Sequence, residues 1–301
     1  MITNTTTIKH SNYYKKLLIT TLLIVVIFTS IIIVYKSTTN NKTIPDDDYF
    51  SLDGVMYVTS EIGLKTVINN NNDTLPNTST IIALNKDITL TETLTIPPNK
   101  NITLTSNKTT GFYKLIGAEY NNSTVLVEGG GVLWLEGIIV THVEGVFGRG
   151  VYVDVKGKLV LSDGEISGNL GGGGVYNEGA FIMSGGVISR NTAKSGGGVF
   201  NFGVFTMSGG KITNNTVDVS GGGVTNSGVF NMSGGEISNN TAAPWHPLLT
   251  GGVGGGVDNN GGIFNMSGGI ITNNTATLGG DNITFGGTLN KTGGTITKSD
   301  H

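Results

Sequence analysis

The sequence predicts an all-β fold: a single-stranded parallel β-helix of roughly nine coils, with a short capping helix at its N-terminal end and one transmembrane helix before it. Three observations carry this prediction. A segment of about 24 residues repeats through the second half of the chain, apolar residues alternate with other residues inside each repeat, and 48 of the 301 residues are glycine. Alternation with a period of two is typical of β-strands, and a unit this short buries an apolar core only by stacking on its neighbours.

Each repeat consists of two sequence signatures. The first is GGGV-x-N, which occurs four times with spacings of 24, 25 and 33 residues. The second is F-x-M-S-G-G-x-I-S/T, which follows each copy of the first. The longer spacing of 33 residues predicts an insertion in one coil, between 242 and 252. The paired signatures lie at 172–177 and 181–189, 196–201 and 205–213, 221–226 and 230–238, and 254–259 and 264–272.

Within a repeat we expect three short strands, G-G-V-x-N, x-F-x-M-S and x-I-S/T, joined by turns of Gly, Asn and Ser. Coils of a β-helix lie about 4.8 Å apart, so equivalent residues form columns along the axis. Four apolar columns are predicted to fill the interior. They are Val175, Val199, Val224 and Val257; Phe181, Phe205, Phe230 and Phe264; Met183, Met207, Met232 and Met266; and Ile188, Ile212, Ile237 and Ile271.

Two further columns hold asparagine. Stacked side-chain amides can form hydrogen bonds from coil to coil, and asparagine tolerates the left-handed backbone conformation of a tight corner. We therefore expect amide ladders, the first of them at a left-handed corner. The two columns are Asn177, Asn201, Asn226 and Asn259, and Asn169, Asn191, Asn215, Asn240 and Asn274.

The first half of the chain has less regular coils. Short β-rich pieces between 81 and 104 are separated by Asn, Asp and Pro, and similar pieces continue from 125 to 135. The stretch 60–69 places Leu64, Val67 and Ile68 at helical spacing behind a serine. A short helix there would cover the N-terminal end of the core, because a bare end exposes apolar side chains and an unpaired strand edge.

Residues 17–34 form an uncharged apolar run whose helix would be about 27 Å long, enough to cross a bilayer. Three lysines precede the run and three aspartates follow it at 46–48, so the N-terminus is predicted to be cytoplasmic and the β-helix extracellular. A cleaved signal peptide is the alternative. The predicted organisation is a cytoplasmic segment 1–16, a signal-anchor 17–35, a polar linker 36–50, a β-helix domain 51–297 and a tail 298–301.

Composition limits the chemistry. With a net charge of −3 and only 13% charged residues, the chain lacks the basic surface of a nucleic-acid binder. There is no cysteine, so disulfides, thiolate metal sites and cysteine nucleophiles are excluded. No glycine-rich phosphate loop precedes a helix. We expect no cofactor and no metal.

The repeats GGGV-x-N and F-x-M-S-G-G-x-I-S-x-N-T-A resemble those of adhesin-like microbial surface proteins within the right-handed parallel β-helix, or pectate-lyase-like, superfamily. The likeness is specific over 171–297 and looser over about 55–170, where 97–107 and 122–131 are also similar. The resemblance implies a right-handed helix and an adhesive or structural role at the cell surface. The wider superfamily includes polysaccharide lyases and glycoside hydrolases, so the fold alone does not decide activity.

A sugar-cleaving enzyme of this kind would need carboxylates close together on neighbouring coils. The outward column before the first asparagine column holds a single carboxylate, and the outward column before the isoleucines holds isolated charges. No catalytic residue is therefore assigned. The densest mixed-charge patch, with Arg149 and His142 nearby, includes the candidate ligand-binding residues Asp154, Lys156 and Lys158, together with Asp163 and Glu165. The insertion offers two more candidates, Trp245 and His246; the alternative is that Trp245 and Leu248 fold back onto the rod and shield it.

The sequence thus predicts a single-pass membrane protein, anchored through Leu17–Val34, whose extracellular β-helix has an adhesive or structural role. Its partners would be a surface glycan or a protein of a host or neighbouring cell. The alternative is a polysaccharide lyase or glycoside hydrolase, which the scarcity of paired carboxylates and of arginine disfavours.

Overall fold

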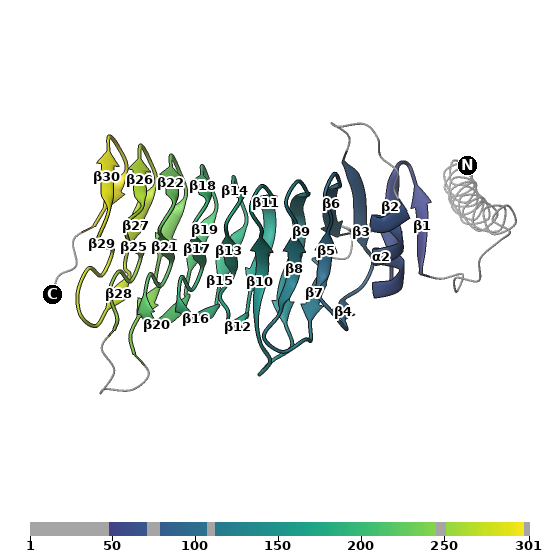
Figure 1. Cartoon of the computed structure of the whole chain (residues 1–301), viewed down its shortest axis with the longest axis horizontal. Coiled ribbons are helices and arrows are strands. Elements are labelled where there is room, and N and C mark those ends of the chain that lie inside the picture. The colour runs from purple at the N-terminus through teal and green to yellow at the C-terminus, as the bar shows by residue number, and fades with distance from the viewer. Residues whose placement is uncertain (1–47, 71–78, 107–111, 245–250, 298–301) are drawn as a thin grey trace, which may run out of the picture. The chain divides into compact units, whose positions relative to one another are not determined.

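A computed structural model describes residues 48–70, 79–106, 112–244 and 251–297. These residues form a parallel β-solenoid of about nine turns, of the right-handed type, with coils stacked from the N-terminal to the C-terminal end (Figure 1). The all-β prediction and the coil number are confirmed. Among the described residues no helix is long and apolar enough to cross a bilayer; the span predicted at 17–34 lies outside them.

The largest sheet has 18 strands and carries two adjacent faces of the solenoid, because its long strands β9 and β11 continue around a bend and join both faces. One face contains β1 (Tyr49–Leu52), β2 (Val55–Val58), β3 (Thr80–Leu84), β6 (Asn101–Ser106), β9 (Val132–His142), β11 (Lys158–Ser167), β14 (Ala180–Met183), β18 (Val204–Met207), β22 (Val229–Met232), β26 (Ile263–Met266) and β30 (Thr288–Lys291). The other face adds β4 (Ile88–Leu90), β7 (Lys114–Gly117), β15 (Val187–Ser189), β19 (Lys211–Thr213), β23 (Glu236–Ser238), β27 (Ile270–Thr272) and β31 (Thr295–Ile296).

Two smaller sheets complete the coils. The second sheet contains β5 (Leu94–Ile96), β8 (Ser123–Val127), β10 (Phe147–Val153), β12 (Leu170–Gly171), β13 (Val175–Asn177), β17 (Val199–Asn201), β21 (Val224–Asn226), β25 (Val257–Asn259) and β29 (Ile283–Phe285). The third, which the sequence did not predict, contains β16 (Thr192–Ser195), β20 (Thr216–Ser220), β24 (Thr241–Ala242) and β28 (Thr275–Ala276). Only one or two small apolar residues in each of these strands face inward, so the sequence shows no apolar alternation from which the strands could be predicted.

The register of the strands confirms the four apolar columns. Phe181, Phe205, Phe230 and Phe264 are direct strand partners, all 0% exposed, and their rings stack with centroids 4.6 to 4.7 Å apart. The matching valine, methionine and isoleucine columns are at most 1% exposed. Each repeat therefore buries its apolar residues against the coil before it and the coil after it.

The asparagine columns are buried amide ladders, as predicted. In the longer one each Nδ2 donates to the Oδ1 of the next coil, from Asn169 through Asn274 to Asn282. The expectation of a left-handed corner at the first column, Asn177 to Asn259, is wrong, because none of its members has positive φ. The left-handed residues are instead exposed ones at a different corner, namely Arg190, Asn214, Asn239 and Asn273, each directly before a ladder asparagine.

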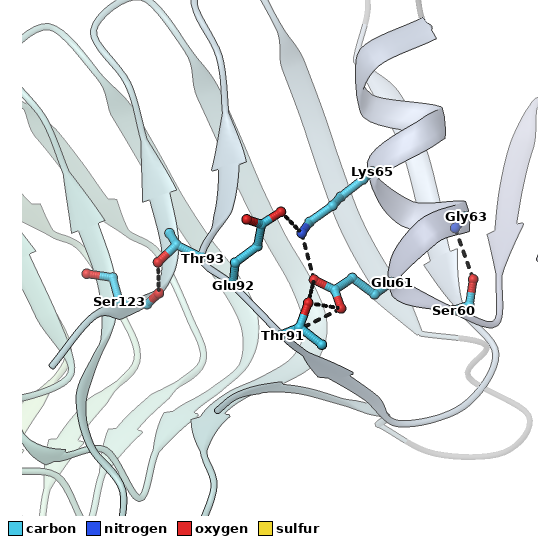
Figure 2. Close-up of polar contacts among 8 residues, drawn as sticks. All are labelled: Ser60, Glu61, Gly63, Lys65, Thr91, Glu92, Thr93 and Ser123. Carbon is cyan, nitrogen blue, oxygen red and sulfur yellow. Dashed lines mark hydrogen bonds and ion pairs between the residues drawn. The ribbon is translucent and has the colours of Figure 1, made fainter. Parts of the chain in front are cut away.

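The predicted capping helix is confirmed as α2 (Glu61–Asn70), which buries Leu64, Val67 and Ile68. The Ser60 Oγ accepts a hydrogen bond from the Gly63 N–H at 3.0 Å, a standard N-cap. Figure 2 shows how the helix is fixed to the coil below: Glu61 accepts hydrogen bonds from Thr91, and Lys65 bridges Glu61 and Glu92 at 2.6 Å each. The sequence did not predict the antiparallel hairpin β1–β2, which lies beside this helix.

Candidate functional site

Four aromatic side chains line the outer face of the second sheet. Tyr152 in β10, Tyr176 in β13 and Phe200 in β17 are direct strand partners on three successive coils, and Phe202 follows β17. The ring centroids of Tyr152 and Tyr176 are 5.4 Å apart, those of Tyr176 and Phe200 5.6 Å, and those of Phe200 and Phe202 4.9 Å. We call Tyr152, Tyr176, Phe200 and Phe202 the aromatic ladder.

The ladder faces outward because of the pattern of the strands that carry it. In β10 the flanking residues Val151 and Val153 are fully buried, so Tyr152 between them must point away from the core. Tyr176 and Phe200 are half-buried, and Phe202 is 47% exposed. Four rings gathered on one outer face form an apolar surface of the kind that marks interaction sites.

Arg149 flanks the ladder on the side where β10 begins. Its guanidinium lies 5.0 Å from the ring centroid of Tyr176 and 5.6 Å from that of Tyr152, which is the range of a cation–π interaction. Within the part of the chain that the structure describes, no carboxylate forms an ion pair with Arg149. Its hydrogen-bond donors are therefore held beside the rings and available to a ligand.

Carboxylates flank the ladder on the other side, where the strands end. Val127, Val153 and Asn177 are register partners, and each is followed directly by an acidic residue. Glu128, Asp154 and Glu178 therefore occupy the same corner on three successive coils, about one strand spacing apart. All three are half-buried. We call these three residues the acidic column.

The ladder and the acidic column are in contact. The Tyr152 hydroxyl donates a 2.6 Å hydrogen bond to Oε2 of Glu178. This bond, with partial burial and the charges of Glu178 and Asp154, raises the pKa of Tyr152 to about 12. The hydroxyl thus stays protonated at neutral pH, donates its hydrogen bond to Glu178 and is a poor source of phenolate.

Beyond Phe200 the column of rings gives way to short polar residues. Its next two register partners are Thr225 and Asp258, which are 1% and 7% exposed. The Thr225 hydroxyl donates to the Ser220 carbonyl, and burial raises the pKa of Asp258 although the Ser220 hydroxyl partly offsets this. At the corner, Ser227 and then Asn260 follow Phe202 in the equivalent position.

The structure places some residues of the mixed-charge patch predicted from the sequence on this face and the others elsewhere. Arg149 and Asp154 lie beside the aromatic ladder, and Lys156 is exposed in the turn after Asp154. Lys158 lies around the corner on the largest sheet, with its ammonium 5.7 Å from the ring centroid of Trp134. Glu165 also lies on that sheet, where it pairs with Arg190 at 2.7 Å, while the Asp163 carboxylate accepts the Gly164 N–H.

Two other predicted features are not part of this face. Trp245 and His246 lie outside the described residues. His142 is 5% exposed, and its Nδ1 lies 3.0 Å from the Thr124 hydroxyl and 3.2 Å from Oδ1 of Asn169. It therefore forms the beginning of the longer amide ladder. Among the residues with described positions, no three acidic or histidine side chains are grouped so as to hold a metal ion.

Tyr176 and Phe200 belong to the outward column that directly precedes the first asparagine column, so the signal for these two rings was present in the repeats. Tyr152 and the acidic column were harder to find, because Glu128 and Asp154 lie in irregular coils without the repeat signature, and only the strand register aligns them with Glu178.

The comparisons with known proteins add no relative. No model of a known protein family matches the chain, and no characterised protein or solved structure matches it either. The geometry of this face is therefore the basis on which a function can be inferred.

Proposed function

We propose that this protein is a cell-surface β-solenoid that binds glycans through the aromatic ladder, in an adhesive or structural role. The observation that supports the proposal is the row of four rings on one outer face, flanked by Arg149 on one side and by the acidic column on the other. Sugar rings have apolar C–H faces and a rim of hydroxyls, so they need aromatic surface next to charged and polar groups.

The spacing of the rings also suits a polymer. The rings of Tyr152, Tyr176 and Phe200 follow the axis of the solenoid with centroids 5.4 to 5.6 Å apart, about the width of one sugar ring, and Phe202 lies beside Phe200 on the same coil. A glycan lying along the axis would meet a ring or a polar group on each coil. Several weak contacts of this kind add up to useful affinity through multivalency. Exposure at the cell surface rests on the predicted signal-anchor at 17–34.

A second candidate function is glycan cleavage. The specific observation in its favour is the acidic column, since hydrolases and lyases of polysaccharides act with carboxylates held near the scissile bond. Against it, Glu178 is engaged by the Tyr152 hydroxyl and the Asp154 Oδ1 accepts the Val155 N–H. We place this activity second.

One experiment tests both candidates. The purified unit Asp48–His301 is incubated with a panel of neutral, amino-bearing and acidic polysaccharides, and both retention and released sugar are measured. We expect retention without release, weakened at least about tenfold by Tyr176→Ala or Phe202→Ala, which is about 1.4 kcal/mol of binding. The matched control is Phe50→Ala, because Phe50 is an exposed aromatic residue far from the ladder in sequence.

Sugar release that depends on Glu128 or Asp154 would favour the second candidate. Absence of retention across the panel, or retention that both ladder variants leave unchanged, would contradict glycan binding at this face.

A further inference from the structure

We propose that the glycan bound at the aromatic ladder carries free amino groups, and that the acidic column receives them. This inference rests on the proposed function and specifies the chemistry of its ligand. It is argued from the arrangement of charge around the exposed rings.

Arg149, the rings and the acidic column lie side by side across the face. Arg149 and Tyr152 are in β10 and Asp154 follows its end, so the rings separate the guanidinium from the carboxylates. In the following coil Glu178 comes two residues after Tyr176, and a glycine, Gly172, lies directly against Arg149. One flank thus holds Arg149 alone, whereas the other holds three carboxylates over three coils, with the exposed Lys156 in the turn after Asp154.

The acidic column has no cationic partner in the described part of the chain. The ion pairs found there involve Glu61, Glu92, Glu165 and Glu236. Glu178 and Asp154 each accept one hydrogen bond from a neutral donor, the Tyr152 hydroxyl and the Val155 N–H. Three carboxylates that follow register partners on successive coils make this corner negatively charged, so it would attract a bound cation.

An ammonium group on a sugar suits this corner. It carries three donors, and each hydrogen bond to a carboxylate would be charge-assisted. When the apolar face of a sugar stacks on Tyr176, or on Phe202 at the corner next to Glu178, the hydroxyl and amino groups at the edge of that sugar would reach toward the acidic column. On the next two coils toward the C-terminal end, Ser227 and Asn260 offer a hydroxyl and an amide to neutral groups of the glycan.

The same charges disfavour an acidic glycan. A uronate or sulfate lying along the ladder would find Arg149 on one flank and pass three carboxylates on the opposite flank, where Lys156 is the one nearby cation. Like charges held close together oppose binding. The face therefore discriminates by charge among glycans of similar shape.

The test compares three hexasaccharide probes on the full-length chain: a glucosamine oligomer at a pH where its amines are protonated, its fully N-acetylated form, and an oligogalacturonate. We expect the amino form to bind at least about tenfold more tightly than the acetylated form at low salt. This advantage should shrink at about 0.3 M salt, and the oligogalacturonate should bind most weakly.

Variants locate the effect. Asp154→Asn and Glu178→Gln preserve size and the ability to accept a hydrogen bond, so each should reduce the advantage of the amino probe while leaving the acetylated probe unchanged. The control is Glu136→Gln, which removes an exposed carboxylate on the largest sheet. Phe202→Ala should weaken both probes, because it removes a ring on which either one stacks.

Equal binding of the amino and acetylated probes would overturn this inference while leaving glycan binding intact. So would an advantage that Asp154→Asn and Glu178→Gln leave unchanged, or tighter binding of the oligogalacturonate. If none of the three probes binds, and the polysaccharide panel is also not retained, the proposed function itself fails.

Discussion

The side chains that hold the solenoid together act in columns, so each one has a partner both above and below it. Phe205 and Phe230 show this most clearly, because each ring is stacked between two others with interplanar angles of 3° to 6°. Rings of the aromatic ladder lie on the outer surface, with centroids 4.9 to 5.6 Å apart. One residue type thus serves the core at one position of the repeat and a candidate binding face at another.

Replacing Phe230 by alanine should destabilise the fold strongly. The substitution leaves a cavity between two coils and removes two ring contacts, so we expect a loss of about 3–5 kcal/mol in the free energy of unfolding. The matched control is Phe202→Ala, since that ring is 47% exposed and should cost far less. Denaturant unfolding of the two variants measures the difference. Similar losses would contradict the assignment of Phe230 to the interior.

Stability should also depend on pH through His142. Burial lowers the pKa of this imidazole, although Asn169 and the backbone of Glu119 and Asn122 partly oppose the shift. The unfolded chain therefore takes up a proton more readily than the folded one, and stability falls as the pH drops below about 6.5.

The measurement is the thermal unfolding midpoint between pH 7.5 and pH 5.5 in the wild type and in His142→Gln. The wild type should lose more stability over this interval, because the variant lacks the titrating ring. The difference between the two proteins isolates His142 from Asp258, whose raised pKa favours the folded state in acid and acts in the opposite direction. Identical pH profiles would show that His142 does not titrate differently in the two states.

At the scale of elements, the glycine turns that precede the strands of the second sheet allow these strands to pack closely against the isoleucine column. In three of the four GGG triplets the last glycine, Gly174, Gly198 or Gly223, lies against the isoleucine column. At Gly198 an added Cβ would come within 2.6 Å of Cγ2 of Ile212 and of the Gly223 carbonyl oxygen. This close approach explains the repeated glycine better than backbone conformation does, since Gly198 has no positive φ.

Gly198→Ala should therefore shift the strand β17 and cost about 1–3 kcal/mol of stability by overpacking. The control is Gly286→Ala, because Gly286 is exposed and its nearest neighbour would be 3.3 Å from the new Cβ. Both substitutions are compared by thermal unfolding. A neutral Gly198→Ala would mean that the faces are packed more loosely than described.

The elements also show what sequence could and could not predict. The strands that carry phenylalanine, methionine and isoleucine, and the helix α2, follow from periodicity and from the serine N-cap. The third sheet was missed because strands such as β24 have two residues. The asparagine corners were assigned to the wrong column, because a buried amide ladder and a left-handed turn favour the same residue type.

At the scale of the whole molecule, the candidate site is a product of register. The aromatic ladder and the acidic column join residues from regular repeats with residues from irregular coils. Tyr152 and Tyr176 become neighbours only because β10 and β13 pair with a fixed offset. Sequence predicted the columns inside the regular repeats and the location of Arg149 and Asp154 in one patch, but it could not align the irregular coils with the regular ones.

The central claim is that residues about 24 positions apart lie directly over one another, and the absence of native cysteine makes it directly testable. Ile182 and Thr206 are register partners on the outer surface of β14 and β18, so their Cα atoms lie within the range a disulfide spans. The double variant Ile182→Cys/Thr206→Cys should form an intramolecular disulfide under mild oxidation, detected by mass spectrometry. The shifted pair Ile182→Cys/Ser208→Cys should remain reduced. A disulfide in the shifted pair, with free thiols in the aligned one, would contradict the stacking on which the whole account depends.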